Sequence, residues 1–317
     1  MKRTLMISAI VLAIAMISTF VWMGLSISGM ATTELKKPSK PIVLVTVPPY
    51  QKMVTQLASD AVEVIPVIPP HVDPHNWEPT YKDMERLRGA IVWFTIGEGF
   101  EPSLAKKLTE VNPKMHIYNL NTQISAPKSA ENHYHSDNES RRNHHNHPEY
   151  DTHTWLAPIF AKQQASFIAN ILSDIVPLED AEIKNNYLKL EETLKELDVN
   201  STHALLPFHG DIIVTTHGAY TSYCDAFNLI QVVIEPSEGK EPRMGEITSL
   251  ISDLKKDKAR IIGIFTQPQH SNKAAMIIAR DLNIPTYEVD PYEADYIETI
   301  RRITTIISLS AAEGDPT

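Results

Sequence analysis

Short apolar runs rich in β-branched residues alternate with segments of helical periodicity along most of the chain. A first series of strands is predicted over 41–47, 62–68, 90–97 and 115–120, and a second over 211–216, 229–234, 260–266 and 284–289. The clearest helices are predicted between these strands, over 50–58, 80–90, 102–112, 244–258 and 272–283. Alternation of this kind predicts an α/β fold with mostly parallel sheets covered by helices on both faces. Its repetition predicts two β/α lobes.

A long polar segment with one apolar stripe separates the two series. Within 178–206 there is no glycine or proline, and the apolar residues recur at intervals of three and four. These residues are Ile183, Tyr187, Leu190, Leu194 and Leu197. A helix of about 25 residues is about 40 Å long. We therefore expect one long helix over 178–206 to join an N-terminal lobe (41–177) to a C-terminal lobe (207–317).

The N-terminus has the pattern of an export segment. Lys2 and Arg3 precede an apolar run without charges that continues to about residue 30. The run is also long enough to cross a bilayer, which takes about 20 apolar residues. We expect 1–31 to be either a signal peptide that is removed or an N-terminal membrane anchor, followed by a linker over 32–40. The protein is then exported, to the periplasm or the cell surface.

The composition of the chain argues against some classes of partner and against an internal disulfide. Hydrophobic residues make up 43% of the chain and charged residues 21%, which is ordinary for a globular protein. The net charge of −10 argues against a nucleic-acid partner. The single cysteine, Cys224, excludes an internal disulfide, and we expect it to be buried and unreactive.

Two groups of histidines stand out among the thirteen in the chain. Five of them lie in a polar tract over 132–148: His133, His135, His144, His145 and His147. We expect this His-rich loop to be an insert without fixed structure. It either gathers metal ions weakly, a few imidazoles at a time, or is a solvated insert with no metal role.

The second group is placed at predicted strand ends and at the junction of the lobes. His71 and His75 follow the second predicted strand, His217 follows the first strand of the second series, and Asp290 follows its last strand. His153 lies at the junction, before the helical region. Open α/β sheets bind ligands at the carboxyl ends of their strands. Imidazole and carboxylate groups are good ligands for Zn²⁺, so a metal site in the cleft between the lobes is one hypothesis. Taken singly, a histidine at a strand end is more often a structural hydrogen-bonding group than a ligand, and Asp290 before Pro291 could simply begin a turn.

Around these positions the sequence resembles the metal-binding solute-binding proteins of ABC importers for zinc and manganese. The resemblance extends from about residue 41 to residue 310. The segments that carry it are "DPHNWEPT", "THTWLAP", "VVIEPSEGKEP", "IFTQPQHSNKAAMIIARDL" and "VDP". It implies two β/α lobes joined by one long helix, a divalent metal ion as cargo and the permease of an ABC transporter as partner. We also expect a monomer.

Carried over residue by residue, the resemblance implies four metal ligands: His75, His153, His217 and Asp290. The third segment reads "THGAY" where the family commonly has "SHDAF", and the ligand type is kept. Gln267 stands where the family has a carboxylate, so the charge around the site is expected to differ.

The ligand types and the His-rich tract favour Zn²⁺ as cargo. Mn²⁺ prefers more oxygen ligands, and it remains the alternative together with Fe²⁺. The extra imidazoles of His71 and His270 are expected to be bystanders. A zinc-dependent hydrolase is the rival from another class, but catalytic zinc keeps an open coordination position, which four protein ligands would close. We therefore expect a binding protein and not an enzyme. A surface scavenger or adhesin with the same site and no transporter is a third alternative.

Overall fold

A computed structural model of the chain describes residues 40–124, 151–235 and 241–310, all of which belong to one compact unit. The predicted export segment (1–31), nearly all of the linker and the His-rich tract (132–148) lie outside the described residues. Among the residues that are described, no helix combines the length and the apolar character that a membrane span requires.

The first predicted series of strands forms a four-stranded parallel sheet with the order β2-β1-β3-β4. Its strands are β1 (Ile42–Val45), β2 (Glu63–Pro66), β3 (Val92–Thr95) and β4 (His116–Asn119). β2 lies at an edge of the sheet. Pro66 has no amide hydrogen to donate, and an edge strand tolerates this because only one of its sides is paired.

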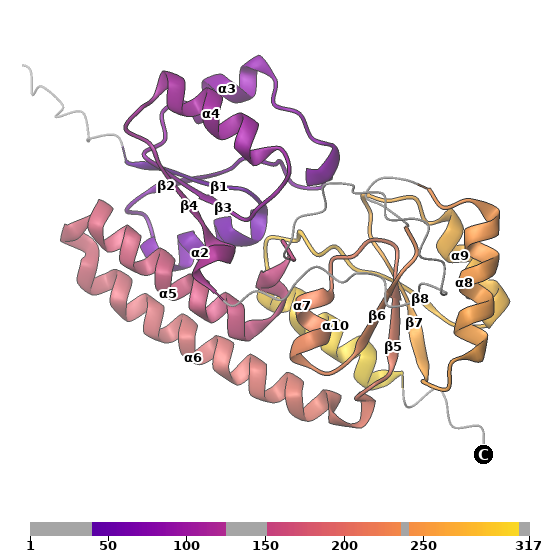
Figure 1. Ribbon diagram of the computed structural model, residues 1–317. Helices are drawn as coiled ribbons and strands as arrows, with labels where there is room; N and C mark the ends of the chain where they lie inside the picture. The colour runs from indigo at the N-terminus through magenta and orange to yellow at the C-terminus, as the bar shows by residue number, and fades with distance from the viewer. Residues whose placement is uncertain (1–39, 125–150, 236–240, 311–317) are drawn as a thin grey trace, which may run out of the picture. The chain divides into compact units, whose positions relative to one another are not determined.

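Helices cover both faces of this sheet (Figure 1). The helices are α2 (Pro48–Ala58), α3 (Tyr81–Leu87) and α4 (Glu101–Val111). Leu44 and Trp93 belong to the apolar cluster with α3 and α4, whereas Val43 and Val45 belong to the cluster with α2 and the long helices. Burial on both faces explains why these strands read as continuous apolar runs.

The second series repeats the arrangement with the order β6-β5-β7-β8. Its strands are β5 (Ile212–Thr215), β6 (Ile230–Val233), β7 (Ile261–Thr266) and β8 (Thr286–Glu288), and its helices are α7 (Thr221–Ala226), α8 (Met244–Lys256), α9 (Lys273–Leu282) and α10 (Tyr296–Leu309). Gly263 is required in β7, because a Cβ there would lie 2.7 Å from the ring of Tyr287 and 2.9 Å from the carbonyl oxygen of Pro285. Cys224 on α7 is buried and free, as predicted.

Two long helices, α5 (Pro158–Ile175) and α6 (Asp180–Leu205), connect the two series (Figure 1). A short 3₁₀ turn, Pro177–Glu179, separates them, and α6 continues for 26 residues. Apolar residues of both sheets, of α6 and of α10 belong to one continuous buried cluster, which includes Val45, Leu194, Ile213 and Ile300. The predicted fold class, two parallel-sheet α/β lobes joined by a long helix, is confirmed.

Candidate metal centre

Three of the four residues predicted as ligands meet in the structure. Three ring nitrogens, one each from His75, His153 and His217, lie within 4.8 Å of one another. Nε2 of His75 is 3.0 Å from Nε2 of His217, although 142 positions separate the two residues along the chain. Their side chains are almost entirely buried. The arrangement offers three imidazole nitrogens to one ion.

Each histidine comes from an irregular segment next to an element that fixes it. His75 lies in the 3₁₀ turn Pro74–Asn76, whose N-cap Asp73 accepts a hydrogen bond from the His75 backbone amide at 3.0 Å. His153 immediately precedes the 3₁₀ turn Thr154–Leu156 that leads into α5. His217 follows β5 at its carboxyl end. The predicted position of His217 after the first strand of the second series is therefore confirmed.

Buried carboxylates hold two of the rings. Nδ1 of His75 is 3.1 Å from Oε2 of Glu98, and Nδ1 of His153 is 3.2 Å from Oδ1 of Asp151. Both carboxylates are about as buried as the imidazoles. A carboxylate that accepts from Nδ1–H leaves the lone pair on Nε2, which is the state of an imidazole that binds a metal. Both rings are thus oriented for coordination through Nε2.

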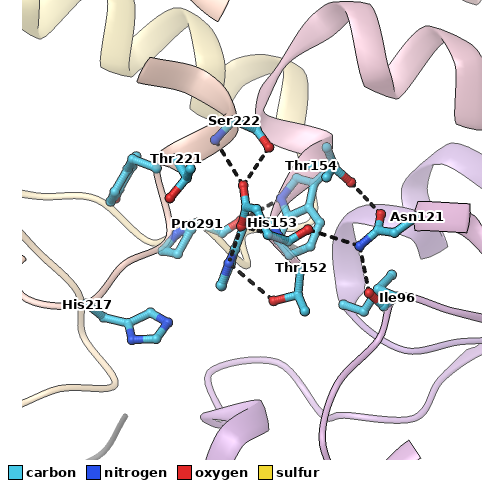
Figure 2. A network of polar contacts seen from close by, with 12 residues as sticks. Ile96, Asn121, Thr152, His153, Thr154, His217, Thr221, Ser222 and Pro291 are labelled. Atoms are coloured by element: carbon cyan, nitrogen blue, oxygen red, sulfur yellow. Dashed lines mark hydrogen bonds and ion pairs between the residues drawn. The ribbon is translucent and has the colours of Figure 1, made fainter. Parts of the chain in front are cut away.

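Asp151 also connects the two lobes. Its Oδ2 accepts hydrogen bonds from the Ser222 backbone amide at 2.9 Å and from the Ser222 hydroxyl at 2.5 Å (Figure 2). One carboxylate therefore orients His153 and holds α7 against the segment that carries His153. On the other side of this segment, Asn121 donates to the carbonyl oxygens of Ile96 and Asp151.

Asp290, the fourth predicted ligand, does not belong to the cluster formed by His75, His153 and His217. Its Oδ1 accepts from the Tyr292 backbone amide at 2.9 Å, and its Oδ2 lies 3.6 Å from Nδ1 of His71. The oxygen that faces the histidines belongs to Tyr292. Its hydroxyl is 2.7 Å from Nε2 of His153 and 3.4 Å from Nε2 of His75.

The two extra histidines differ from each other. The side chain of His71 is 74% exposed, and its backbone has a positive φ of 63°. His270 is buried, and its ring stacks on that of His217 with centroids 4.9 Å apart and planes 9° apart. Its Nδ1 is 3.2 Å from Oε1 of Glu235. His270 therefore supports one face of His217.

The electrostatics of the first lobe centre on two glutamates after β3. Gly97 has a φ of 99°, and this conformation turns the chain so that Glu98 meets His75. Burial disfavours the charged form of Glu98, but the imidazoles of His75 and His153 outweigh it, and the pKa of Glu98 is lowered. Burial raises the pKa of neighbouring Glu101 to about 7, against hydrogen bonds from Thr46 and Ile96 that favour its charged form.

Sequence reasoning missed Glu98, Asp151 and Tyr292. Glu98 follows the carboxyl end of β3, which is the same signal that selected His217. Asp151 lies two residues before His153, and Tyr292 two residues after Asp290. A search of the neighbours of each candidate would have found all three residues, but it would not have shown which imidazole each one contacts.

The protein has two parallel-sheet lobes, and buried imidazoles from residues far apart in the sequence meet in one cluster. Together, these features define a metal-binding protein of the solute-binding class. The model of the family described as "Zinc-uptake complex component A periplasmic" matches residues 43–309, and the chain belongs to this family. Members are periplasmic solute-binding proteins of ABC importers and not enzymes. The resemblance stated from the sequence, and the choice of a binding protein over a hydrolase, are confirmed.

Individual relatives agree with the family. The chain is 24% identical to the high-affinity zinc uptake system protein ZnuA of Yersinia pestis, over 78% of this chain and 82% of that protein. It is 25% identical to the zinc-binding lipoprotein AdcA of Streptococcus pneumoniae over 80% of this chain, and it covers 50% of that protein. A crystal structure of ZnuA superposes with a TM-score of 0.74 at 25% identity, covering 85% of this chain and 98% of the other.

Proposed function

We propose that this protein captures Zn²⁺ with His75, His153 and His217, with Asp290 supplying the carboxylate of the site, and passes the ion to the permease of an ABC importer. The observation that supports the ligand set most strongly is the meeting of three imidazole nitrogens from three distant segments within 4.8 Å. Two of these rings are held by buried carboxylates with Nε2 directed inward.

The donor set favours zinc over manganese. Imidazole suits Zn²⁺, whereas Mn²⁺ prefers a site richer in carboxylate, carbonyl and water oxygens. The first-row affinity order also places zinc above manganese and ferrous iron at most nitrogen sites. Two carboxylates, Glu98 and Asp151, face the imidazoles and not the ion in this arrangement, so they increase the basicity of the nitrogen donors.

Delivery requires that the protein meets its permease outside the cytoplasm. The family is periplasmic. We propose that residues 1–31 direct export, as a removed signal peptide or a retained anchor, and that the mature chain works as a monomer. Mass spectrometry of the N-terminus and sedimentation of purified protein test these two parts separately.

The ligand set is tested by competitive titration of Zn²⁺ and Mn²⁺ against a chromophoric chelator. His75→Ala and His217→Ala should each weaken zinc binding by more than about 100-fold, since even residues that only support ligands cost about 10–100-fold when lost. His203→Ala is the matched control, because His203 is an exposed imidazole on α6. Unchanged affinity in His217→Ala would reject the proposed site. Tighter binding of Mn²⁺ than of Zn²⁺ would reject zinc as the cargo.

A further inference from the structure

The hydroxyl of Tyr292 lies beside two of the three imidazoles. It lies 2.7 Å from Nε2 of His153 and 3.4 Å from Nε2 of His75. We propose that Tyr292 binds Zn²⁺ through its oxygen as the phenolate, and that its proton is released to solvent when the ion binds. This inference rests on the proposed function, because it assumes that the histidines hold Zn²⁺. It changes one part of that proposal: the oxygen donor is Tyr292, and Asp290 acts through its charge and its hydrogen bond from the Tyr292 amide.

The separations between the donor atoms fit one ion. Four ligands at 2.0–2.1 Å from a tetrahedral Zn²⁺ lie about 3.3 Å from one another. The structure gives 3.0 Å for the pair His75 Nε2 and His217 Nε2, 3.4 Å for His75 Nε2 and the Tyr292 hydroxyl, and 2.7 Å for His153 Nε2 and the same hydroxyl. These three separations lie on either side of the value for a tetrahedral site.

The carboxylate of Asp290 is directed to other partners. Oδ1 accepts from the backbone amide of Tyr292 at 2.9 Å, and Oδ2 lies 3.6 Å from Nδ1 of the largely exposed His71. In this arrangement Asp290 fixes the backbone that carries Tyr292 and contributes negative charge next to the ion. The residue that presents an oxygen to the Nε2 atoms is Tyr292.

Packing holds the Tyr292 ring in this position. The residue is 3% exposed, and its ring contacts the rings of both Trp155 and His153, with centroid distances of 5.8 and 5.4 Å. The indole nitrogen of Trp155 donates to the carbonyl oxygen of Pro291 at 3.0 Å, which fixes the adjoining backbone. A donor that is already ordered loses little entropy when it binds an ion.

The decisive variant is Tyr292→Phe, which removes the oxygen and keeps the ring that packs on Trp155. If the phenol oxygen binds zinc, affinity should fall by about 10–100-fold, the range found when a group supporting a metal site is lost. The visible spectrum of the Co²⁺-loaded protein should change as well, because one donor atom is exchanged. Asp290→Asn should lower affinity and leave the Co²⁺ band positions of the wild type.

Tyr220→Phe is the matched control. It removes another buried hydroxyl of the same lobe, one that donates to the carbonyl oxygen of Val289 at 3.2 Å and does not contact the imidazoles in the described structure. Its zinc affinity and Co²⁺ spectrum should equal those of the wild type.

Two other outcomes separate the possible failures. If Tyr292→Phe binds zinc as tightly as the wild type or more tightly, with an unchanged Co²⁺ spectrum, the hydroxyl is only a hydrogen-bond donor to His153 that the ion displaces, and this inference is overturned. If His217→Ala also keeps full affinity, the proposed site itself fails. Loss in His217→Ala together with no loss in Tyr292→Phe rejects the phenol ligand alone.

Discussion

Replacing Glu98 by glutamine tests whether a buried carboxylate sets the state of His75. The substitution keeps the size and the buried position of the side chain, which is 2% exposed, and removes the charge 3.1 Å from Nδ1 of His75. It also allows the amide NH₂ group to face Nδ1. In that orientation Nδ1 becomes the acceptor and the proton moves to Nε2, where it blocks coordination.

The expected magnitude follows from this contact. A hydrogen bond to a charged group contributes about 1.5–3 kcal/mol. Loss of a carboxylate that orients a metal-binding histidine costs about 10–100-fold in affinity, or about 1.4–2.7 kcal/mol. The two ranges agree, so we expect Glu98→Gln to raise the dissociation constant for Zn²⁺ by about 10–100-fold.

The assay is competitive titration with a chelator of known affinity, together with a double-mutant cycle. If Glu98 acts through His75, adding Glu98→Gln to His75→Ala should cause no further loss, because the two changes remove one interaction. Glu85→Gln is the control, since Glu85 is an exposed glutamate that pairs with Arg88 at 2.9 Å. A Glu98→Gln protein that binds zinc within twofold of the wild type would refute the reasoning.

Three further predictions concern acid, a second glutamate and the His-rich tract. Acidification through about pH 6 should release Zn²⁺, because imidazole must be neutral to coordinate and its ordinary pKa is about 6.5; equilibrium dialysis that finds zinc retained well below pH 5 would contradict a histidine site. Glu101 has its pKa raised from 4.5 to about 7, so the metal-free protein should be most stable below about pH 4.5 with respect to this group and lose about 3 kcal/mol as the pH rises through 7. Urea unfolding at several pH values should show this loss in the wild type and not in Glu101→Gln, whereas parallel curves would argue against it. Deleting 132–148 should lower the total amount of zinc bound and leave the tight site unchanged by calorimetry; loss of the tight site would mean that the tract supplies one of its ligands.

Local sequence patterns were sufficient for most of the fold. Every predicted strand exists, because strands that are buried on both faces must be apolar throughout. The long helix α6 also follows from spacing alone, since Ile183, Leu190, Leu194 and Leu197 face the core. The observed strands are shorter than predicted at several ends. The apolar run over 90–97 continues past β3, for example, because Ile96 is buried without pairing in the ladder.

The contacts of the site could not be derived in the same way. Strand ends indicated where His75 and His217 lie, but the partner of each imidazole depends on how distant segments pack. Tyr292 and His153 are 139 positions apart, and the lobes are joined at Asp151 and Ser222 across 71 positions. Sequence spacing contains no information about such pairs. The orientation of Asp290 and the approach of the Tyr292 hydroxyl depend in addition on side-chain torsions, which are set by the packing of Trp155.

The continuous core predicts how far the lobes move when zinc binds. Val45 of the first sheet and Ile213 of the second belong to one buried cluster with Leu194 of α6 and Ile300 of α10. A wide hinge motion would have to open this cluster, and α6 offers no glycine or proline at which to bend. We therefore expect zinc to change only two of the segments that carry the donors, around residues 71–77 and 290–292. Small-angle scattering should give the same radius of gyration with and without zinc, and hydrogen exchange should slow in those segments alone. A smaller radius with zinc, accompanied by altered exchange at both ends of α6, would show that the lobes close as rigid bodies and that the shared core does not restrain them.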